Sequence, residues 1–297
     1  MTPAEVAGRL REAGIAAAPD DITLEERDDR WLARLGDGRL AWFPANPRGA
    51  ERLGRERRML ALLAARCGFR VPRVLFESAE GWDVRAPVPG SGDLWALYRR
   101  VTADPALAGR IGAEIGAILA EQHTRIGADD VSNWLPNLPD WPQPTAQLRT
   151  DLPHVIDDTA LIATINRVLD DYDAVEVTAA DKVPVHGDLG LHNMAIDAAT
   201  GRVEGVFDYD GASWSDRHHD FRYLLFDEGA ETMLEAALAI YEPTVGRRLN
   251  RERIHLYNAA CAIGFLAYRR GVPADERWCG RTLEEDLRWV RGAIGRI

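Results

Sequence analysis

The sequence predicts an α+β protein of two lobes: a small N-terminal β-sheet lobe with one main helix, and a larger, mostly helical C-terminal lobe. Short strand patterns are concentrated in residues 1–86, apart from three short segments later in the chain, and apolar residues at helical spacing dominate residues 93–297. A segment rich in Pro and Gly at 87–92 separates these parts and predicts a hinge. The length of 297 residues suits two such parts better than one small domain.

The N-terminal 86 residues contain the signals of a small sheet. Thr2-Pro3 followed by Glu5 predicts a capped helix start. Within a strand-like region at 22–43, residues 31–35 and 39–43 flank a Gly-Asp-Gly turn, which predicts a β-hairpin. We expect a helix at 49–66 and further strands at 71–77 and 82–85.

The C-terminal part begins with helical spacing, since an apolar residue recurs every fourth position from Leu107 to Leu119. Residues 131–153 predict a long surface loop, followed by a helix at 159–172. Short strands are expected at 183–186, 194–197 and 203–209. Helices fill the rest, and we expect breaks at Pro243, at 271–273 and at Gly280.

Composition excludes several classes of protein. No apolar run approaches the roughly 20 residues of a membrane span, and the N-terminus does not resemble a signal peptide. Three widely spaced cysteines suit a reducing compartment, so we expect a cytoplasmic protein. The net charge of −11 disfavours nucleic acid as a partner. Residues 1–90 carry +1 and residues 91–297 carry −12, which fits either simple solubility or attraction of a cationic ligand.

One segment contains the residues that point to chemistry. Asp188 follows a predicted strand on a tight loop, Asn193 comes five residues later, and Asp208 ends the partner strand of a hairpin. Asn193 and Asp208 can converge on one divalent ion, while Asp188 points toward the space in front of the loop. Phosphoryl transfer requires a metal on the phosphate oxygens and a carboxylate that accepts a hydroxyl proton.

His186-Gly187-Asp188 followed by Asn193 resembles the catalytic loop of the aminoglycoside phosphotransferase family, relatives of the protein kinases. Phe207-Asp208 is similar to that family's metal-binding segment. The stretch at 216–221, which contains Asp220, is similar to the segment that follows the metal-binding one. The resemblance extends from about residue 30 onward and implies a bilobal protein-kinase-like fold.

The resemblance also implies roles for individual residues. Asp188 would be catalytic, Asn193 and Asp208 would hold Mg²⁺, and His186 and Asp220 would support the loop. ATP or GTP would occupy the cleft between the lobes, its base held by backbone at Ala86, Pro87 and Val88. The expected contacts with ammonium groups of the acceptor are Asp227, Glu228, Asp275 and Glu276. Each of these four acids can equally be part of a solvated acidic face.

The N-terminal part departs from the family pattern. Kinase-like folds place a lysine on the third strand, paired with a helix glutamate, whereas residues 40–43 here offer no cation. Acidic residues at 25–29 also replace the expected glycine-rich loop. Arg34, Arg39 and Arg48 are the candidate substitutes for the lysine. Glu56 or Glu51 would be the helix glutamate, with an ordinary surface ion pair as the alternative for Glu56.

These observations predict an O-phosphotransferase that moves the γ-phosphate of ATP or GTP to a hydroxyl of a cationic, aminoglycoside-like antibiotic or related metabolite. One alternative acceptor is a neutral metabolite or a macrolide. A second alternative is a catalytically impaired protein that only binds nucleotide or ligand, since the strand lysine is missing. A third is a hydrolytic metal centre, whose ligands would come from His186, Asp188, His192, His218, His219 and Asp220.

Overall fold

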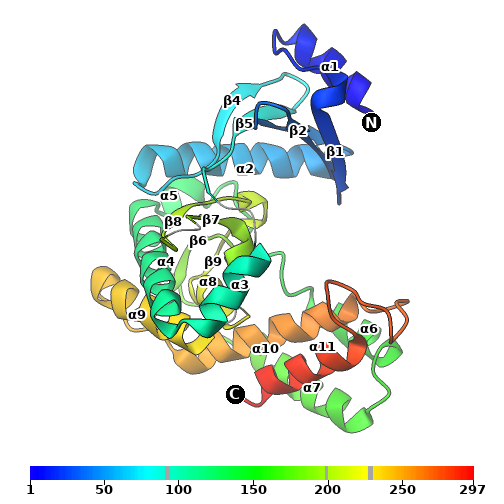
Figure 1. Ribbon diagram of the computed structural model, residues 1–297. Helices are drawn as coiled ribbons and strands as arrows, with labels where there is room; N and C mark the ends of the chain where they lie inside the picture. Colours follow the sequence, from blue (N-terminus) through cyan, green and yellow to red (C-terminus); the bar gives the residue numbers. More distant parts are fainter. Residues whose placement is uncertain (91–93, 198–199, 227–229) are drawn as a thin grey trace.

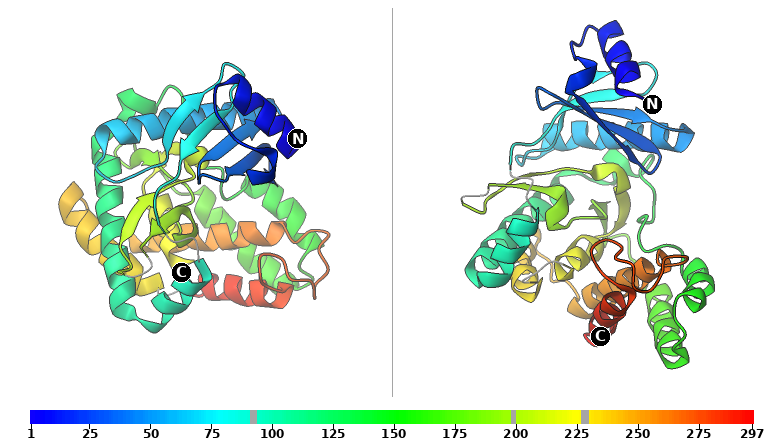
Figure 2. Two further views of the ribbon diagram at one scale, coloured as in Figure 1. Left: turned by 45° about the horizontal axis from the view of Figure 1, so that its top comes forward. Right: turned by 45° about the vertical axis from the view of Figure 1, so that its right-hand side comes forward.

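The computed structural model describes residues 1–90, 94–197, 200–226 and 230–297. The N-terminal lobe holds a five-stranded sheet and two helices, and the C-terminal lobe is mostly helical (Figure 1). Seen from two further sides, the two lobes lie one above the other, with the chain passing between them after β5 (Figure 2). This arrangement confirms the predicted fold class.

The antiparallel sheet has the strand order β1-β2-β3-β5-β4. Its strands are β1 (Ile22–Arg27), β2 (Arg30–Leu35), β3 (Leu40–Pro44), β4 (Arg73–Glu77) and β5 (Asp83–Ala86). The predicted hairpin is present as β2 and β3, joined by a turn in which Gly38 has a φ of +87°. The register pairs Leu40 with Arg85 and Trp42 with Asp83, so these four side chains share one face of the sheet.

The two faces of the sheet differ in what covers them. One face, which includes Ala41, Phe43 and Val84, packs against the apolar side of α1 (Pro3–Glu12). The other face is turned toward α2 (Pro47–Arg66), which lies between the sheet and the C-terminal lobe (Figure 1). Asn46 caps α2 by accepting a hydrogen bond from Gly49 N at 3.0 Å.

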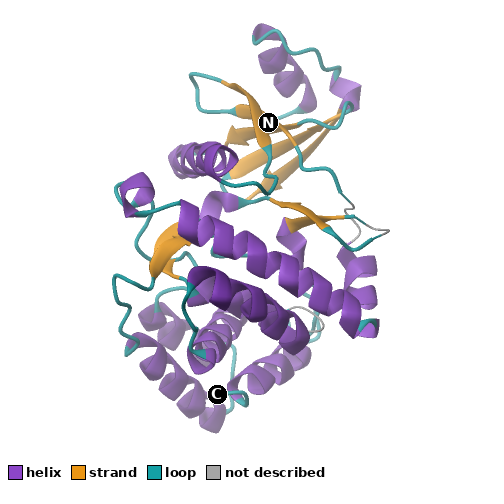
Figure 3. Cartoon of the chain, turned by 90° about the vertical axis from the view of Figure 1, so that its left-hand side faces the viewer, coloured by secondary structure: helices purple, strands orange, loops and turns teal. Residues whose placement is uncertain are grey.

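Two long helices form the core of the C-terminal lobe. The helix α4 (Pro105–Arg125) follows α3 (Leu94–Ala103) and packs along α9 (Ala230–Val245). Gly112 and Gly116 allow this close approach, because a Cβ atom on either would lie 2.3 Å or less from a carbonyl oxygen of α9. Figure 3 shows these helices in the lower lobe, beneath the sheet of the upper one.

Two small sheets carry the loops between α7 and α8. The strand β6 (Lys182–Val185) pairs with β9 (Ser213–Asp216), and β7 (Met194–Ile196) pairs with β8 (Val203–Val206). We predicted strands at the positions of β6, β7 and β8, although β8 ends at Val206 rather than at residue 209. The strand β9 was not predicted, because its Ser-Trp-Ser-Asp sequence lacks an apolar run.

Six further helices of the described ranges complete the C-terminal lobe. They are α5 (Ala128–Val131), α6 (Thr145–Asp151), α7 (Thr159–Asp173), α8 (His218–Arg222), α10 (Arg251–Ala267) and α11 (Leu283–Ile294). Among them, α5 lies beside α2 of the N-terminal lobe (Figure 1). Apolar side chains of α6, α7, α10 and α11 pack together in one cluster.

Two expectations need correction. The predicted loop at 131–153 contains α5's last residue and α6, and Pro243 lies inside α9, which ends two residues later. None of the helices in the described ranges is long and apolar enough to cross a membrane.

Candidate active site

A cavity of about 630 Å³ lies between the lobes, and both lobes contribute to its wall. The N-terminal lobe supplies residues of β2, β3, β5 and α2, while the C-terminal lobe supplies residues 188 and 191–196 together with 207–208. Pro87, Val88 and Gly90 line it where the chain crosses from one lobe to the other. This cavity is therefore the reference for the positions of the residues that the sequence predicted.

The loop after β6 is held by a buried aspartate. Asp220 of α8 accepts hydrogen bonds from the backbone nitrogens of His186, at 3.0 Å, and Gly187, at 2.9 Å. Gly187 has a φ of +87°, and a Cβ atom there would lie 2.9 Å from the oxygen of Gly211. Burial raises the pKa of Asp220, but these bonds and the nearby His123 outweigh burial and hold it below its ordinary value. The carboxylate thus stays charged and fixes the loop.

A buried arginine supports the same loop from the other side. Arg222 donates to the carbonyl oxygen of Gly187 at 2.8 Å, and its Nε lies 2.8 Å from Sγ of Cys261 in α10. Its side chain is fully buried. This role of Arg222 was not predicted, because its partners lie 35 and 39 residues away along the chain.

Asp188 lies on the floor of the cavity, which is the part of its wall that the C-terminal lobe supplies. Of its side chain, 46% is exposed. Nδ2 of Asn193 donates to its backbone oxygen at 2.8 Å and to its Oδ2 at 3.0 Å. Burial raises the pKa of Asp188, but hydrogen bonds from His192 and Tyr223 hold it below the ordinary range. Its carboxylate is therefore ionised at neutral pH and able to accept a hydrogen bond from a molecule in the cavity.

Asp208 lies opposite, two residues after β8, in the left-handed backbone conformation with a φ of +68°. His186 Nε2 lies 2.9 Å from the oxygen of Phe207, which ties this segment to the loop after β6. Burial, with the carboxylates of Asp210 and Glu56 nearby, raises the pKa of Asp208 to about 8. Such crowding of negative charge is what a bound cation would relieve.

The residues present fit a divalent metal ion. Both hydrogen bonds made by the Asn193 amide nitrogen go to Asp188, which leaves its side-chain oxygen as a potential ligand. With the carboxylate of Asp208, this gives the oxygen ligands that Mg²⁺ prefers. Asn193, Asp188 and Asp208 all line the cavity.

The N-terminal wall carries a cation from an unexpected strand. Glu56 of α2 is buried, and its Oε2 lies 2.7 Å from Nη1 of Arg85 on β5. The alternative surface pair for Glu56 is therefore not what the structure shows. Arg34 lines the cavity from its exposed position on β2, whereas Arg39 bonds to Asp37 and to the oxygen of Ala16.

The other expected positions differ in how the structure places them. Arg48 is largely exposed and lies 3.5 Å from Asp29, and Glu51 is exposed on α2. Pro87 and Val88 line the cavity, but Ala86, which ends β5 opposite Arg73, is not among the lining residues. Arg85 was missed because a single charged residue in a short strand does not by itself indicate a binding role.

Of the four acids expected to bind the acceptor, two can be placed. Asp275 and Glu276 are exposed in the loop that follows α10, and neither is among the described residues that line the cavity. Asp227 and Glu228 lie outside the described residues. The expected linker at 87–92 likewise runs into residues 91–92, which lie outside them.

Stacked aromatic rings lie near the loop after β6. The rings of Trp141 and Tyr268 stack at 5.2 Å with an interplanar angle of 10°, and Trp278 stacks on Tyr268 at 5.7 Å. Nη2 of Arg222 lies within hydrogen-bond distance of the oxygens of both Trp141 and Gly187, which brings the stack close to the loop. Tyr268 remains 48% exposed.

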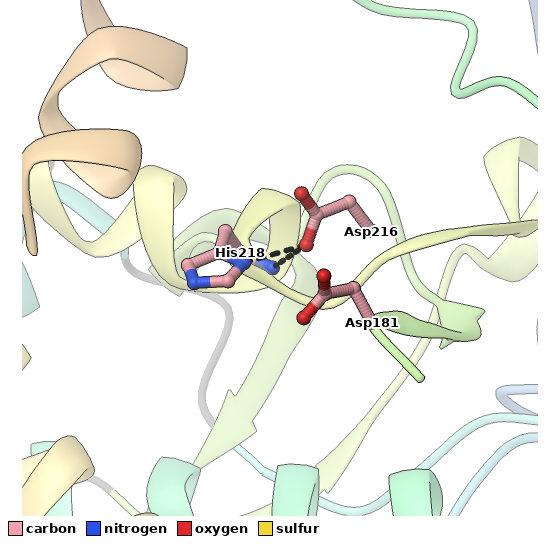
Figure 4. Close-up of side chains that lie close together, drawn as sticks. All are labelled: Asp181, Asp216 and His218. Carbon is pink, nitrogen blue, oxygen red and sulfur yellow. Dashed lines mark hydrogen bonds and ion pairs between the residues drawn. The ribbon is translucent and has the colours of Figure 1, made fainter. Parts of the chain in front are cut away.

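A second cluster of ionisable side chains lies in the C-terminal lobe. Asp181, Asp216 and His218 offer ligand atoms within 4.8 Å of one another (Figure 4). Their partners, however, are supplied by the protein. His218 donates from Nδ1 to Asp216 and accepts at Nε2 from Asn250 N, and two arginines, Arg247 and Arg253, neutralise the carboxylates. This cluster is a satisfied ion-pair network that joins the turn before β6 to β9, α8 and α10.

The hydrolytic metal centre predicted as an alternative does not form from the described residues. Among them, one group of three potential metal-binding side chains lies together, and it shares only His218 with that set. His186 contacts the backbone of Phe207 and Asp188 instead. His219 stacks on Tyr257 at 4.2 Å, and burial lowers its pKa to about 3.

Comparison with known proteins agrees with this geometry. The profile of the phosphotransferase enzyme family (APH) matches residues 9–255. A comparison with curated protein sequences finds no match. Among solved structures, the GDP and kanamycin complex of APH(2")-IIIa superposes with a TM-score of 0.70 at 14% identity, covering 98% of each chain.

Two further solved structures share the fold. The apoenzyme of macrolide 2'-phosphotransferase MphH from Brachybacterium faecium has a TM-score of 0.64 at 19% identity, covering 99% of this chain and 98% of that one. The ADP-bound aminoglycoside phosphotransferase APH(2'')-Ib has a TM-score of 0.65 at 18% identity, covering 98% and 96%.

Proposed function

The chain belongs to the phosphotransferase enzyme family, and from this premise we propose that it transfers the γ-phosphate of ATP or GTP to a hydroxyl of a cationic, aminoglycoside-like compound. The observation that carries the proposal is the group formed by Asp188, Asn193 and Asp208 at the floor of a cavity between the lobes. This group supplies an ionised carboxylate beside two metal-compatible oxygen donors, which is the set that phosphoryl transfer requires.

The proposed role of each residue follows from its contacts. Asp188 accepts a hydrogen bond from the acceptor hydroxyl and orients its oxygen toward the γ-phosphorus. As the new oxygen–phosphorus bond forms and the bond to the β-phosphate oxygen breaks, the hydroxyl proton passes to Asp188 and the nucleoside diphosphate leaves. Asn193 and Asp208 would hold Mg²⁺, which offsets charge on the phosphate oxygens when bound. His186, Asp220 and Arg222 keep the loop in position.

The acceptor class rests on charge and on the aromatic stack. Residues 91–297 carry a net charge of −12, whereas residues 1–90 carry +1, and this favours a cation in the C-terminal lobe. Trp141, Tyr268 and Trp278 offer ring faces that suit an ammonium group or the apolar face of a sugar ring. Asp275 and Glu276 belong to the same loop as Trp278 and are proposed as further contacts.

The aromatic stack also favours a second candidate acceptor. A macrolide presents a large apolar ring and one amino sugar, and one of the structures with this fold is a macrolide 2'-phosphotransferase. Salt separates the two candidates, because screening weakens attraction of a polycation much more than contact with an apolar ring.

The test is a coupled assay of nucleotide turnover with Mg²⁺, run separately with ATP and GTP. Aminoglycosides, tuberactinomycins and macrolides serve as acceptors, and Asp188→Ala is the control. Turnover that needs both an acceptor and Asp188 supports the proposal. If the protein binds nucleotide but no panel member is phosphorylated, the acceptor class is wrong, and if no nucleotide binds, the transferase proposal fails.

A further inference from the structure

The polar wall above the catalytic floor is built around an arginine. Lys182 is the one lysine of the chain, and it lies on β6 rather than in the cavity wall. Arg27, Arg34 and Arg100 are exposed where they line the cavity. Among the described residues that line it, Arg85 is the buried cation, with 2% of its surface exposed.

Arg85 is held rigidly by two carboxylates. Its Nε and Nη2 donate to the two oxygens of Asp83 at 2.7 and 3.0 Å, and its Nη1 lies 2.7 Å from Oε2 of Glu56. A guanidinium has five N–H donors, and the two hydrogen bonds to Asp83 use two of them. Arg57 also contacts Asp83, at 3.1 Å, and so shares the charge of that carboxylate.

The neighbouring strand β3 explains how Arg85 can take the place of the lysine that kinase-like folds carry on their third strand. On β3, Ala41 and Phe43 pack into the apolar core, whereas Trp42 faces the cavity. Trp42 is paired with Asp83 in the sheet, and the guanidinium of Arg85 lies 5.8 Å from the centre of its indole. Trp42 and Arg85 therefore share one face of the sheet and one side of the cavity.

We propose that Arg85, presented by β5 and oriented by Glu56, binds the phosphates of the nucleotide in place of the missing lysine of β3. The inference rests on the proposed function, because it assumes that the cavity takes a nucleoside triphosphate. A braced guanidinium suits this task, since its planar fork donates to phosphate oxygens in pairs. The ion pair with Glu56 keeps the side chain in place before the nucleotide arrives.

Equilibrium binding of ADP, GDP and the two nucleosides to purified protein tests this assignment. In Arg85→Ala, affinity for the diphosphates should fall about 10–100-fold, whereas affinity for the nucleosides should stay within about twofold. A purely structural role would weaken nucleoside and diphosphate binding together. Arg85→Lys, which keeps the charge but not the fork, should lie between the wild type and Arg85→Ala. It also provides the readout if Arg85→Ala does not fold.

Arg66→Ala is the matched control, because Arg66 is an exposed arginine of α2 that pairs with Asp130 away from the cavity. It should bind all four ligands like the wild type. The decisive variant is Trp42→Lys combined with Arg85→Ala, which returns a lysine to β3 on the same face. It should recover at least about tenfold of the lost diphosphate affinity.

Two results would overturn the inference while leaving the proposed function intact. The first is a folded Arg85→Ala that binds diphosphates as tightly as the wild type. The second is a folded double variant that binds them no better than Arg85→Ala. If the wild type itself binds no nucleotide, the proposed function fails, and the role of Arg85 fails with it.

Discussion

The floor and the roof of the cavity are built in opposite ways. On the floor, Asp188, Asn193 and Asp208 come from one stretch of 21 residues, and their backbone is held by Asp220 and Arg222 just after it. The roof brings Glu56 of α2 to Arg85 of β5, 29 residues later, beside Trp42 of β3. The proposed chemistry thus resides in a compact segment, whereas the proposed binding of the nucleotide phosphates depends on how separate elements pack. The two regions should respond differently to substitution.

The largest expected effect is on the floor. Asp188→Ala should lower kcat about 10²–10⁴-fold, because the carboxylate that orients the hydroxyl and takes its proton is lost. Nucleotide affinity should change little, as measured by titration with ADP or GDP. Asp170→Ala, which removes an exposed carboxylate of α7, is the matched control. Equal loss of kcat in both variants would show that Asp188 has no special role.

Next in size is the support beneath the floor. Asp220→Asn removes the charge that accepts hydrogen bonds from His186 and Gly187, and should lower the free energy of unfolding by about 2 kcal/mol. Because the loop would shift, kcat should fall about 10–100-fold with KM for nucleotide nearly unchanged. Urea unfolding and steady-state kinetics measure the two effects. An unchanged kcat would mean that the loop does not depend on this anchor.

The roof should give a different kinetic signature. Glu56→Gln leaves Arg85 without its charged partner on α2, so KM for the nucleotide should rise about 5–20-fold while kcat changes little. Glu51→Gln, five residues earlier and exposed on the same helix, should behave like the wild type. A fall in kcat without a change in KM would break the contrast between roof and floor.

The last effect is confined to low pH and concerns stability rather than activity. His219 lies on α8 between the floor and α10, and burial lowers its pKa from 6.5 to about 3. Below about pH 6.5 this histidine binds a proton in the unfolded chain but stays neutral in the folded protein. The free energy of unfolding therefore falls as the pH falls toward 3. His219→Phe, which keeps a ring stacked on Tyr257, should remove about 2 kcal/mol of the loss between neutral pH and about pH 5.

Urea unfolding at the two pH values measures this difference. His154→Gln is the control, because His154 is exposed and its substitution should leave the pH dependence unchanged. Activity at neutral pH should be the same in His219→Phe and the wild type. A parallel loss of stability in His219→Phe and the wild type would place the acid sensitivity elsewhere.

The sequence by itself determined the fold class and identified the residues that form the cavity floor. Asp188 and Asn193 are five residues apart on a tight loop, so local backbone geometry alone brings them together. The hairpin of β2 and β3 was predictable for the same reason, since its turn residues lie next to the strands they join. Short spacing makes such neighbours predictable from sequence, although Asp220 and Arg222 hold the loop in place.

Only the tertiary structure decided which cation faces Glu56, which side chain holds Gly187 and which aromatic rings meet. Arg85 was not among the arginines that the sequence suggested, because its position depends on the register of β5 against β3. Arg222 reaches Gly187 across 35 residues, and Trp141 meets Tyr268 only because α10 packs beside the segment before α6. Contacts between distant elements are set by packing, and no local pattern of residues encodes them.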